Sequence, residues 1–167
     1  MPEPQPLPQV HPVWQELEAA GPQVGIVIAT EADREIISAT CDELLERAIT
    51  FELKVLSAHG NPREVAEYGS TAALRGLRVI IAAAGGAAAL PGVLASYTEL
   101  PVIGIPIRRQ EMGMGGFDAL MSVVQMPDGV PVACMAVNGA RNAAIYAAKI
   151  LAQGGPQHKP GRWTATD

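Results

Sequence analysis

The chain has 167 residues, of which 49% are hydrophobic, 17% charged and only 4% aromatic, and its formal net charge is −5. This length suits a single domain with a sizeable core, and the scarcity of aromatic residues indicates a core of aliphatic side chains and alanine. The negative charge removes the electrostatic basis for binding nucleic acid, no apolar run approaches the roughly 18 residues of a membrane span, and no charged start with an apolar segment marks a signal peptide.

Proline dominates the start of the chain. Five of the first twelve residues are proline, which disfavours a helix or a central strand there. We therefore expect an N-terminal arm over residues 1–22, with a short helix at 13–20 whose Trp14 is available for docking. Residues 23–153 are expected to form one α/β domain, and residues 154–167, which are rich in Gly, Pro and polar residues, a flexible tail.

Apolar runs and helical periodicity alternate through the rest of the chain. Five apolar runs predict strands at residues 24–28, 51–57, 79–84, 102–107 and 130–137. Five segments after them predict helices at residues 34–48, 62–75, 90–97, 118–125 and 140–153. This alternation favours right-handed crossovers and a three-layer, doubly wound α/β fold around a parallel five-stranded sheet. In the flavodoxin-like order 2-1-3-4-5, the third strand is central.

One face of the first predicted helix and both cysteines are expected to be buried in the core. The helix carries an apolar stripe formed by Ile37, Cys41, Leu44, Leu45 and Ala48. Cys41 and Cys134 lack C-x-x-C spacing, so we expect two buried thiols in a protein of the reducing cytoplasm.

The third predicted strand is followed by a glycine turn and the start of a helix. Residues 79–84 are an unbroken apolar run, which is typical of a strand buried on both faces. Gly85 and Gly86 follow, and Pro91 suits the first turn of the next helix. This strand, turn and helix can present backbone N–H groups to an anion. The alternative is that the small residues serve only to pack the helix closely on the strand.

The carboxyl ends of the strands are where ligands bind in such a sheet. Thr30 and Asp33, then Ser57 and His59, follow the first two strands. His59 is the one histidine of residues 23–153, and its strand-end position favours acid–base chemistry over a structural role. No metal-ligand spacing is present, and a Ser–His–Asp triad has little support without a G-x-S-x-G motif.

Several motifs together resemble one enzyme family. They are Ser57-Ala58-His59 followed by Pro62, Gly85-Gly86-Ala87-Ala88 with Leu90-Pro91-Gly92, residues 101–106 (PVIGIP) and residues 118–127 (DALMSVVQMP). Residues 24–152 are similar to the N5-carboxyaminoimidazole ribonucleotide mutases and aminoimidazole ribonucleotide carboxylases of purine biosynthesis, the PurE family.

The resemblance implies a cytoplasmic homo-octamer that needs no metal or organic cofactor. It implies movement of a carboxyl group on an aminoimidazole ribonucleotide, with carbon dioxide held transiently and His59 shuttling the proton. It assigns the nucleotide phosphate to Ser57 and Thr30 and the ribose hydroxyls to Asp33. The full set of substrate-binding residues that it implies is Thr30, Asp33, Ser57, Ala58, Gly85, Gly86, Ala87, Ala88 and Leu90. The low charged fraction, 17%, also suggests extensive subunit contacts.

The departures from the family pattern concern phosphate recognition. Gly60 replaces the arginine that follows the family's histidine, Ala89 replaces a histidine, and Ala29 and Ala32 replace a glycine and a serine of the first turn. Glu31 adds an anion near the expected phosphate. The loop at residues 108–116 is about two residues longer than is usual in the family, and the segment at 138–142 about two shorter. Five arginines are candidates to supply the missing guanidinium: Arg34, Arg63, Arg108, Arg109 and Arg141.

Three functions remain open on the sequence. The first is carboxyl transfer or reversible decarboxylation on an aminoimidazole ribonucleotide. The second is a diverged paralogue that applies the same histidine-centred chemistry to another substrate. The third is a non-catalytic oligomeric binding protein, which the presence of His59, Ser57 and Asp33 argues against.

Overall fold

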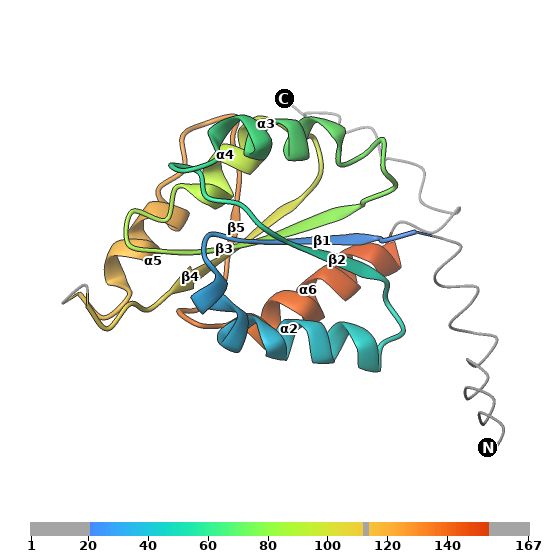
Figure 1. Cartoon of the computed structure of the whole chain (residues 1–167). Coiled ribbons are helices and arrows are strands. Elements are labelled where there is room, and N and C mark those ends of the chain that lie inside the picture. Colours follow the sequence, from blue (N-terminus) through green and yellow to red (C-terminus); the bar gives the residue numbers. More distant parts are fainter. Residues whose placement is uncertain (1–20, 112–113, 154–167) are drawn as a thin grey trace, which may run out of the picture.

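The fold is a parallel sheet covered on both faces by helices (Figure 1). The computed structural model describes residues 21–111 and 114–153. Its strands are β1 (Val24–Ile28), β2 (Phe51–Val55), β3 (Val79–Gly85), β4 (Val102–Ile107) and β5 (Ala133–Cys134). Its helices are the 3-10 turn η1 (Glu31–Asp33), α2 (Arg34–Glu46), α3 (Pro62–Thr71), α4 (Leu90–Ser96), α5 (Phe117–Val124) and α6 (Ala140–Gln153).

The sheet confirms the predicted topology. Its strand order is β2-β1-β3-β4-β5, and every pair is parallel. Central β3 pairs with β1 through Val24 and Val79 and with β4 through Ile80 and Val102. Because all the strands run the same way, the loops after β1, β2, β3 and β4 meet at one edge of the sheet.

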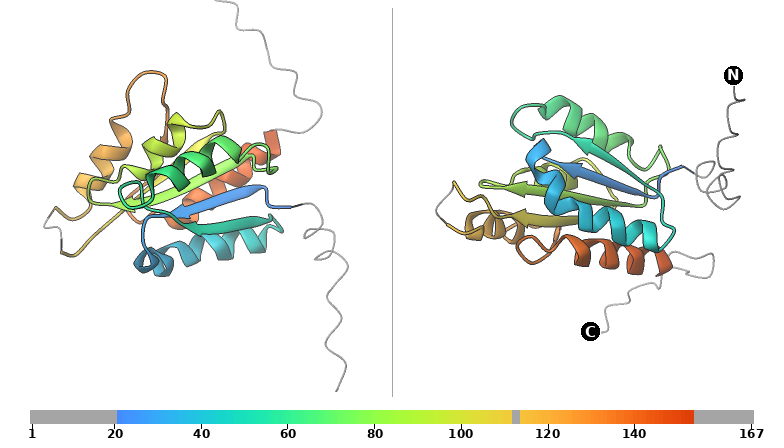
Figure 2. Two further views of the ribbon diagram at one scale, coloured as in Figure 1. Left: turned by 45° about the horizontal axis from the view of Figure 1, so that its top comes forward. Right: turned by 60° about the horizontal axis from the view of Figure 1, so that its bottom comes forward.

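Two apolar layers enclose the sheet. α2 and α6 cover one face, and α3, α4 and α5 cover the other (Figures 1 and 2). Alternate residues of each strand supply the two layers, so that Ile26 and Ile81 belong to the first core and Val27 and Ala82 to the second. The alanines of α6 are buried, which allows this helix to lie close to the sheet and to α2.

The buried side of α2 differs from the predicted stripe. Ile37 and Leu44 are buried, but Leu45 is 47% exposed, Ala48 lies beyond the helix with φ 53°, and Thr40 and Glu43 are buried instead. The reason is that α2 packs on α6 as well as on the sheet. The Thr40 hydroxyl donates to the carbonyl of Ala140 at 2.9 Å, and the Glu43 carboxylate accepts from Arg141 Nε at 2.7 Å.

Most element boundaries agree with the prediction to within a few residues, and the last strand does not. β5 is paired over two residues rather than over 130–137, because Pro131 has no N–H to donate and Asn138, at φ 57°, turns the chain out of the extended region. Cys41 and Cys134 are free thiols that are half-buried rather than buried, and burial raises the pKa of each.

Two expectations concern parts of the chain that the structure does not describe. The N-terminal arm, apart from residues 21–22, and the tail at 154–167 lie outside the described residues. Within residues 21–111 and 114–153, no helix combines the length and the apolar character that crossing a membrane requires.

Candidate active site

The residues predicted to form the site gather at the carboxyl edge of the sheet. A small cleft of about 40 Å³ opens there between the loops that follow β1, β2 and β3. Its lining includes six of the predicted residues: Ser57, Ala58, His59, Gly85, Ala88 and Leu90. Of the others, Gly86 is buried and Ala87 is exposed, while Thr30 and Asp33 follow Ala29, which itself lines the cleft.

His59 projects from a tight turn between β2 and α3. The turn is closed by Asn61 N, which donates to the carbonyl of Ser57 at 2.7 Å, and by Gly60 N, which donates to the Ser57 hydroxyl at 3.1 Å. Pro62 then begins α3. The turn leaves His59 exposed at the wall of the cleft. Ser57 Oγ accepts a bond here, so its own hydrogen remains available for a ligand.

The turn after β3 contains strained backbone. Gly86 has φ 64° and Ala88 has φ 38°, both in the left-handed region, and Ala88 N donates to the carbonyl of Gly85 at 3.2 Å. A left-handed conformation costs a residue with a Cβ roughly 1–2 kcal/mol. Such strain often marks binding segments, and the turn forms one wall of the cleft.

Thr30, Asp33 and Arg109 form a polar cluster beside the cleft. Asp33 is fully buried, and its Oδ2 accepts from Thr30 N at 3.1 Å and from Thr30 Oγ1 at 3.2 Å. Arg109 Nη2 lies 2.6 Å from Asp33 Oδ1 and donates to Thr30 Oγ1 at 3.3 Å. The contact between Arg109 Nη2 and Asp33 Oδ1 is an ion pair without hydrogen-bond geometry, since Oδ1 has no hydrogen-bond partner within the described part of the chain. Arg109 therefore compensates the buried charge of Asp33.

Arg109 reaches Thr30 by crossing the end of β3. β3 lies between β1 and β4, and Gly85 pairs with Ile107 at the end of β4. A Cβ on Gly85 would come within 2.7 Å of Arg109 Cγ and Nε, so glycine makes room for the arginine. At the base of the loop, Arg108 N donates to Asn138 Oδ1 at 2.9 Å. This bond fixes the backbone from which Arg109 projects.

The other arginines proposed from the sequence are engaged elsewhere or lie on the surface. Arg34 pairs with Glu31, and Arg141 pairs with Glu43. The hydrogen bond from Arg34 lowers the pKa of Glu31, so the anion expected to repel a phosphate carries its own counter-charge. No feature of the sequence singled out Arg109. Its position depends on the conformation of the loop after β4.

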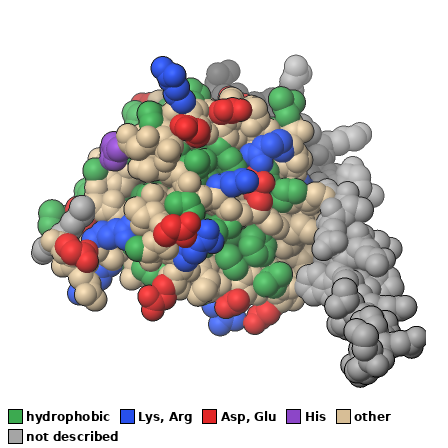
Figure 3. All heavy atoms as spheres, viewed as in Figure 1, with side chains coloured by type: hydrophobic (Ala, Val, Ile, Leu, Met, Phe, Trp, Pro, Cys, Tyr) green, Lys and Arg blue, Asp and Glu red, His purple; other side chains and the backbone are tan. Residues whose placement is uncertain are grey.

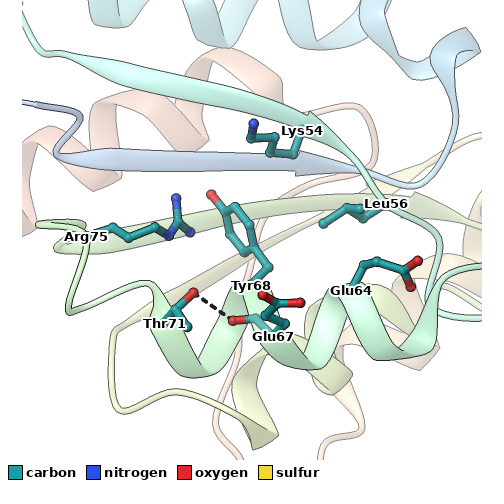
Figure 4. A pocket seen from close by; sticks show the side chains of 7 residues that line it. All are labelled: Lys54, Leu56, Glu64, Glu67, Tyr68, Thr71 and Arg75. Atoms are coloured by element: carbon teal, nitrogen blue, oxygen red, sulfur yellow. Dashed lines mark hydrogen bonds between the residues drawn. The ribbon is translucent and has the colours of Figure 1, made fainter.

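A second hollow lies away from the predicted residues. It has a volume of about 290 Å³ between β2 and α3 and is lined by Lys54, Leu56, Glu64, Glu67, Tyr68, Thr71 and Arg75 (Figure 4). The Arg75 guanidinium lies 4.5 Å from the centre of the Tyr68 ring. Burial raises the pKa of the Tyr68 hydroxyl, and this hydroxyl has no hydrogen-bond partner in the described structure. It packs against the backbone of β1, where a Cβ on Gly25 would overlap it. This contact is structural.

The described residues of the cleft offer groups that can exchange a proton and donate hydrogen bonds. Among residues 21–111 and 114–153, no three His, Cys, Asp or Glu side chains come together as metal ligands. The cleft instead combines an exposed imidazole, a hydroxyl with a free hydrogen and the strained turn after β3. These groups can move a proton and donate hydrogen bonds to a small polar ligand.

Comparison with known proteins gives consistent matches over most of the chain. The family model described as AIR carboxylase matches residues 23–160. The N5-carboxyaminoimidazole ribonucleotide mutase of Pyrococcus abyssi is 46% identical over 138 residues, which are 83% of this chain and 78% of that protein. The phosphoribosylaminoimidazole carboxylase of Ogataea methanolica is 45% identical over 135 residues, 81% of this chain but 24% of that longer protein. The crystal structure of Treponema denticola PurE superposes with a TM-score of 0.70 at 24% identity and covers 80% of this chain and 82% of that one, which supports the fold.

Proposed function

This chain belongs to the AIR carboxylase family, and on that premise we propose that it is a PurE-type enzyme that interconverts N5-carboxyaminoimidazole ribonucleotide and its C4-carboxylated isomer in purine biosynthesis. The observation that carries the proposal is the exposed His59 at the wall of a cleft shared with Ser57, Gly85 and Leu90. The matched relatives are named as enzymes, so the non-catalytic interpretation loses its support.

The proposed reaction needs one proton carrier. The N5–carboxylate bond breaks to release carbon dioxide, and its electron pair takes up a proton at N5. Ring carbon C4 then attacks the carbon dioxide, and its own proton leaves to restore the aromatic ring. His59 can give the first proton and accept the second, because imidazole exchanges a proton near neutral pH. The atoms balance as an isomerisation, and the chain itself supplies the acid and the base.

Substrate positioning is assigned to the groups around the histidine. Ser57 Oγ keeps a hydrogen to donate, because it accepts from Gly60 N, and the turn at residues 85–88 lines the cleft. We assign substrate binding to the set given by the resemblance, namely Thr30, Asp33, Ser57, Ala58, Gly85, Gly86, Ala87, Ala88 and Leu90.

The proposal includes assembly into a homo-octamer in the cytoplasm. The cleft of about 40 Å³ is far smaller than the roughly 300 Å³ or more of a typical ligand pocket, which fits a nucleotide site that other copies complete. Large apolar side chains are also exposed on the single chain: Leu45, Leu74, Tyr97, Met114, Phe117, Val124 and Tyr146. Phe117 and Val124 lie seven residues apart on α5 and thus on one face of it. Figure 3 shows hydrophobic patches between charged side chains on one face of the molecule.

The diverged-paralogue alternative retains one specific observation in its favour. Position 60 carries no cation, and the Thr30 hydroxyl donates its hydrogen to Asp33, so two of the groups expected at a phosphate are missing or engaged. An assay of the isomerisation by absorbance, with His59→Asn as the inactive control, tests the proposed function. Turnover of the ribonucleotide by the wild type supports it, and no turnover at any substrate concentration overturns it in favour of another substrate.

A further inference from the structure

The proposed substrate is a ribonucleotide, and its phosphate carries about two negative charges that the site must accommodate. The ion pairs beside the cleft leave little net charge for this purpose. Glu31 and Arg34 cancel one another, and the Asp33 carboxylate is matched by Arg109. The Thr30 hydroxyl donates its one hydrogen to Asp33. The question is therefore which group donates to the phosphate.

The Arg109 guanidinium has N–H donors that its contacts with Asp33 and Thr30 do not use. A guanidinium group carries five N–H bonds, and the contacts of Arg109 with Asp33 and Thr30 both use Nη2. The hydrogens on Nε and Nη1 have no hydrogen-bond partner among the described residues. The Arg109 side chain is 20% exposed, so it is held against the protein but is still accessible to a ligand.

The placement of the guanidinium relative to the cleft is also suitable. Gly85 lines the cleft, and Arg109 Nε lies so close to Gly85 that a Cβ there would come within 2.7 Å of it. Arg109 is not itself in the lining of the cleft; it lies next to the cleft, beside Gly85 at the end of β3. Its orientation is held at one end by Asp33 and Thr30 and at the other by the bond from Arg108 N to Asn138 Oδ1.

From this geometry we infer that Arg109 binds the phosphate of the substrate, and that Asp33 and Thr30 position it for that role. A guanidinium can hold a carboxylate with one edge and a phosphate with another, and such charge-assisted pairs are short and directional. The inference rests on the proposed function for the identity of the substrate. It adds the loop after β4 to recognition of the anion; β1 and β3 lie between the parent strand of this loop and that of the turn that carries Ser57 and His59.

The test compares binding of ligands with and without the phosphate. Titration calorimetry measures the affinities of wild type and Arg109→Met for aminoimidazole ribonucleotide and for the corresponding riboside. We expect Arg109→Met to weaken ribonucleotide binding by about ten- to a hundredfold and to leave riboside binding unchanged within about twofold. Arg109→Lys keeps the charge without the fork and should lose less. The matched control is Arg108→Met, because Arg108 contributes its backbone N–H to Asn138 and that bond survives the substitution.

Removing Arg109 leaves a buried carboxylate without its cation, so stability is measured in parallel by thermal unfolding. If Arg109→Met does not fold, the double variant Asp33→Asn/Arg109→Met removes charge and partner together. It is titrated in its place and compared with the single variant Asp33→Asn, so that only the effect of Arg109 is measured. Equal losses for ribonucleotide and riboside, or no loss for either, overturn the inference, because Arg109 then acts only on Asp33.

Ribose 5-phosphate separates this inference from the proposed function. If the wild type neither binds nor converts the aminoimidazole ribonucleotide but binds ribose 5-phosphate in an Arg109-dependent manner, the proposed function fails and the role of Arg109 stands. If the wild type converts the ribonucleotide and Arg109→Met binds it equally well, the function stands and the role of Arg109 fails. If no phosphate-bearing ligand binds, both are overturned.

Discussion

Introducing an arginine at position 60, where the family pattern has one, tests how much of the affinity for a phosphate Arg109 already provides. Gly60 is exposed, its φ lies outside the left-handed region, and an added Cβ would lie 3.4 Å from Ser57 Cβ and 3.5 Å from Ser57 Oγ. These are ordinary van der Waals separations. Gly60→Arg should therefore fold normally and place a second guanidinium beside Ser57.

The expected gain depends on whether Arg109 is present. A hydrogen bond between a guanidinium and a phosphate contributes roughly 1.5–3 kcal/mol, or about ten- to a hundredfold in affinity. In the wild type, Arg109 already meets the phosphate, and we expect Gly60→Arg to tighten ribonucleotide binding by less than about threefold. In Arg109→Met the phosphate lacks a cation, and the same change should recover the full ten- to hundredfold, about 1.5–3 kcal/mol.

Calorimetric titration of the four proteins in this cycle yields a coupling free energy, expected at about 1–3 kcal/mol from the difference between the two gains. Gly60→Ala serves as the control for the loss of backbone freedom at position 60. An equal gain from Gly60→Arg in both backgrounds would refute the reasoning, because the two guanidinium groups would then act on the ligand independently. Wild-type binding that is weak and is raised a hundredfold by Gly60→Arg would show that Arg109 does not substitute for the missing arginine.

Further predictions concern catalysis, packing, pH and assembly. His59→Asn should abolish turnover while circular dichroism and light scattering stay unchanged, and an undiminished rate would assign His59 a structural role. Gly25→Ala should destabilise the fold by about 1–3 kcal/mol in urea unfolding, and Tyr68→Phe should recover part of the loss by removing the hydroxyl that a Cβ would overlap; an unchanged midpoint for Gly25→Ala contradicts this packing. Hydrogen bonds, first of all from Arg141, lower the pKa of Glu43 in the folded state. The ion pairs of Glu43 therefore contribute their full stabilisation above the unfolded-state pKa of about 4.3. This stabilisation is lost as the pH falls through the lower folded-state pKa. Glu43→Gln should flatten the dependence of the urea midpoint on pH between about 3 and 6, and an unaltered pH profile would contradict that. Light scattering should give an assembly larger than a monomer at micromolar concentration, and a monomer would remove the proposed octamer.

The sheet could be predicted from the sequence because its central strands are buried on both faces. An unbroken apolar run bounded by glycines, such as residues 79–84, is characteristic of a strand that has no solvent-facing side. The position of the cleft followed from the rule that ligands bind at the carboxyl ends of parallel strands, and six of the predicted residues do line it. Local pattern was sufficient for these features, because the physical cause lies within each segment.

The features that the sequence did not predict depend on contacts between distant segments. Glu43 is buried because Arg141, 98 residues later, reaches its carboxylate, and a hydrophobicity pattern within α2 cannot include that partner. Arg109 reaches Thr30, 79 residues away, across the end of β3. β5 is short because Asn138 turns the chain. In each case a polar interaction or a backbone turn of the folded state overrides the preference of the local sequence.

The separation of His59 from Arg109 has a consequence for how this protein can change over evolutionary time. The two residues belong to different loops, one after β2 and one after β4, and two other strands lie between their parent strands. An insertion or deletion in either loop leaves the backbone pairing of the sheet intact. With the roles proposed for Arg109 and His59, substrate preference and reactivity are therefore separable traits. A lineage could exchange one loop, alter the ligand that it selects, and keep the residue proposed for proton transfer unchanged.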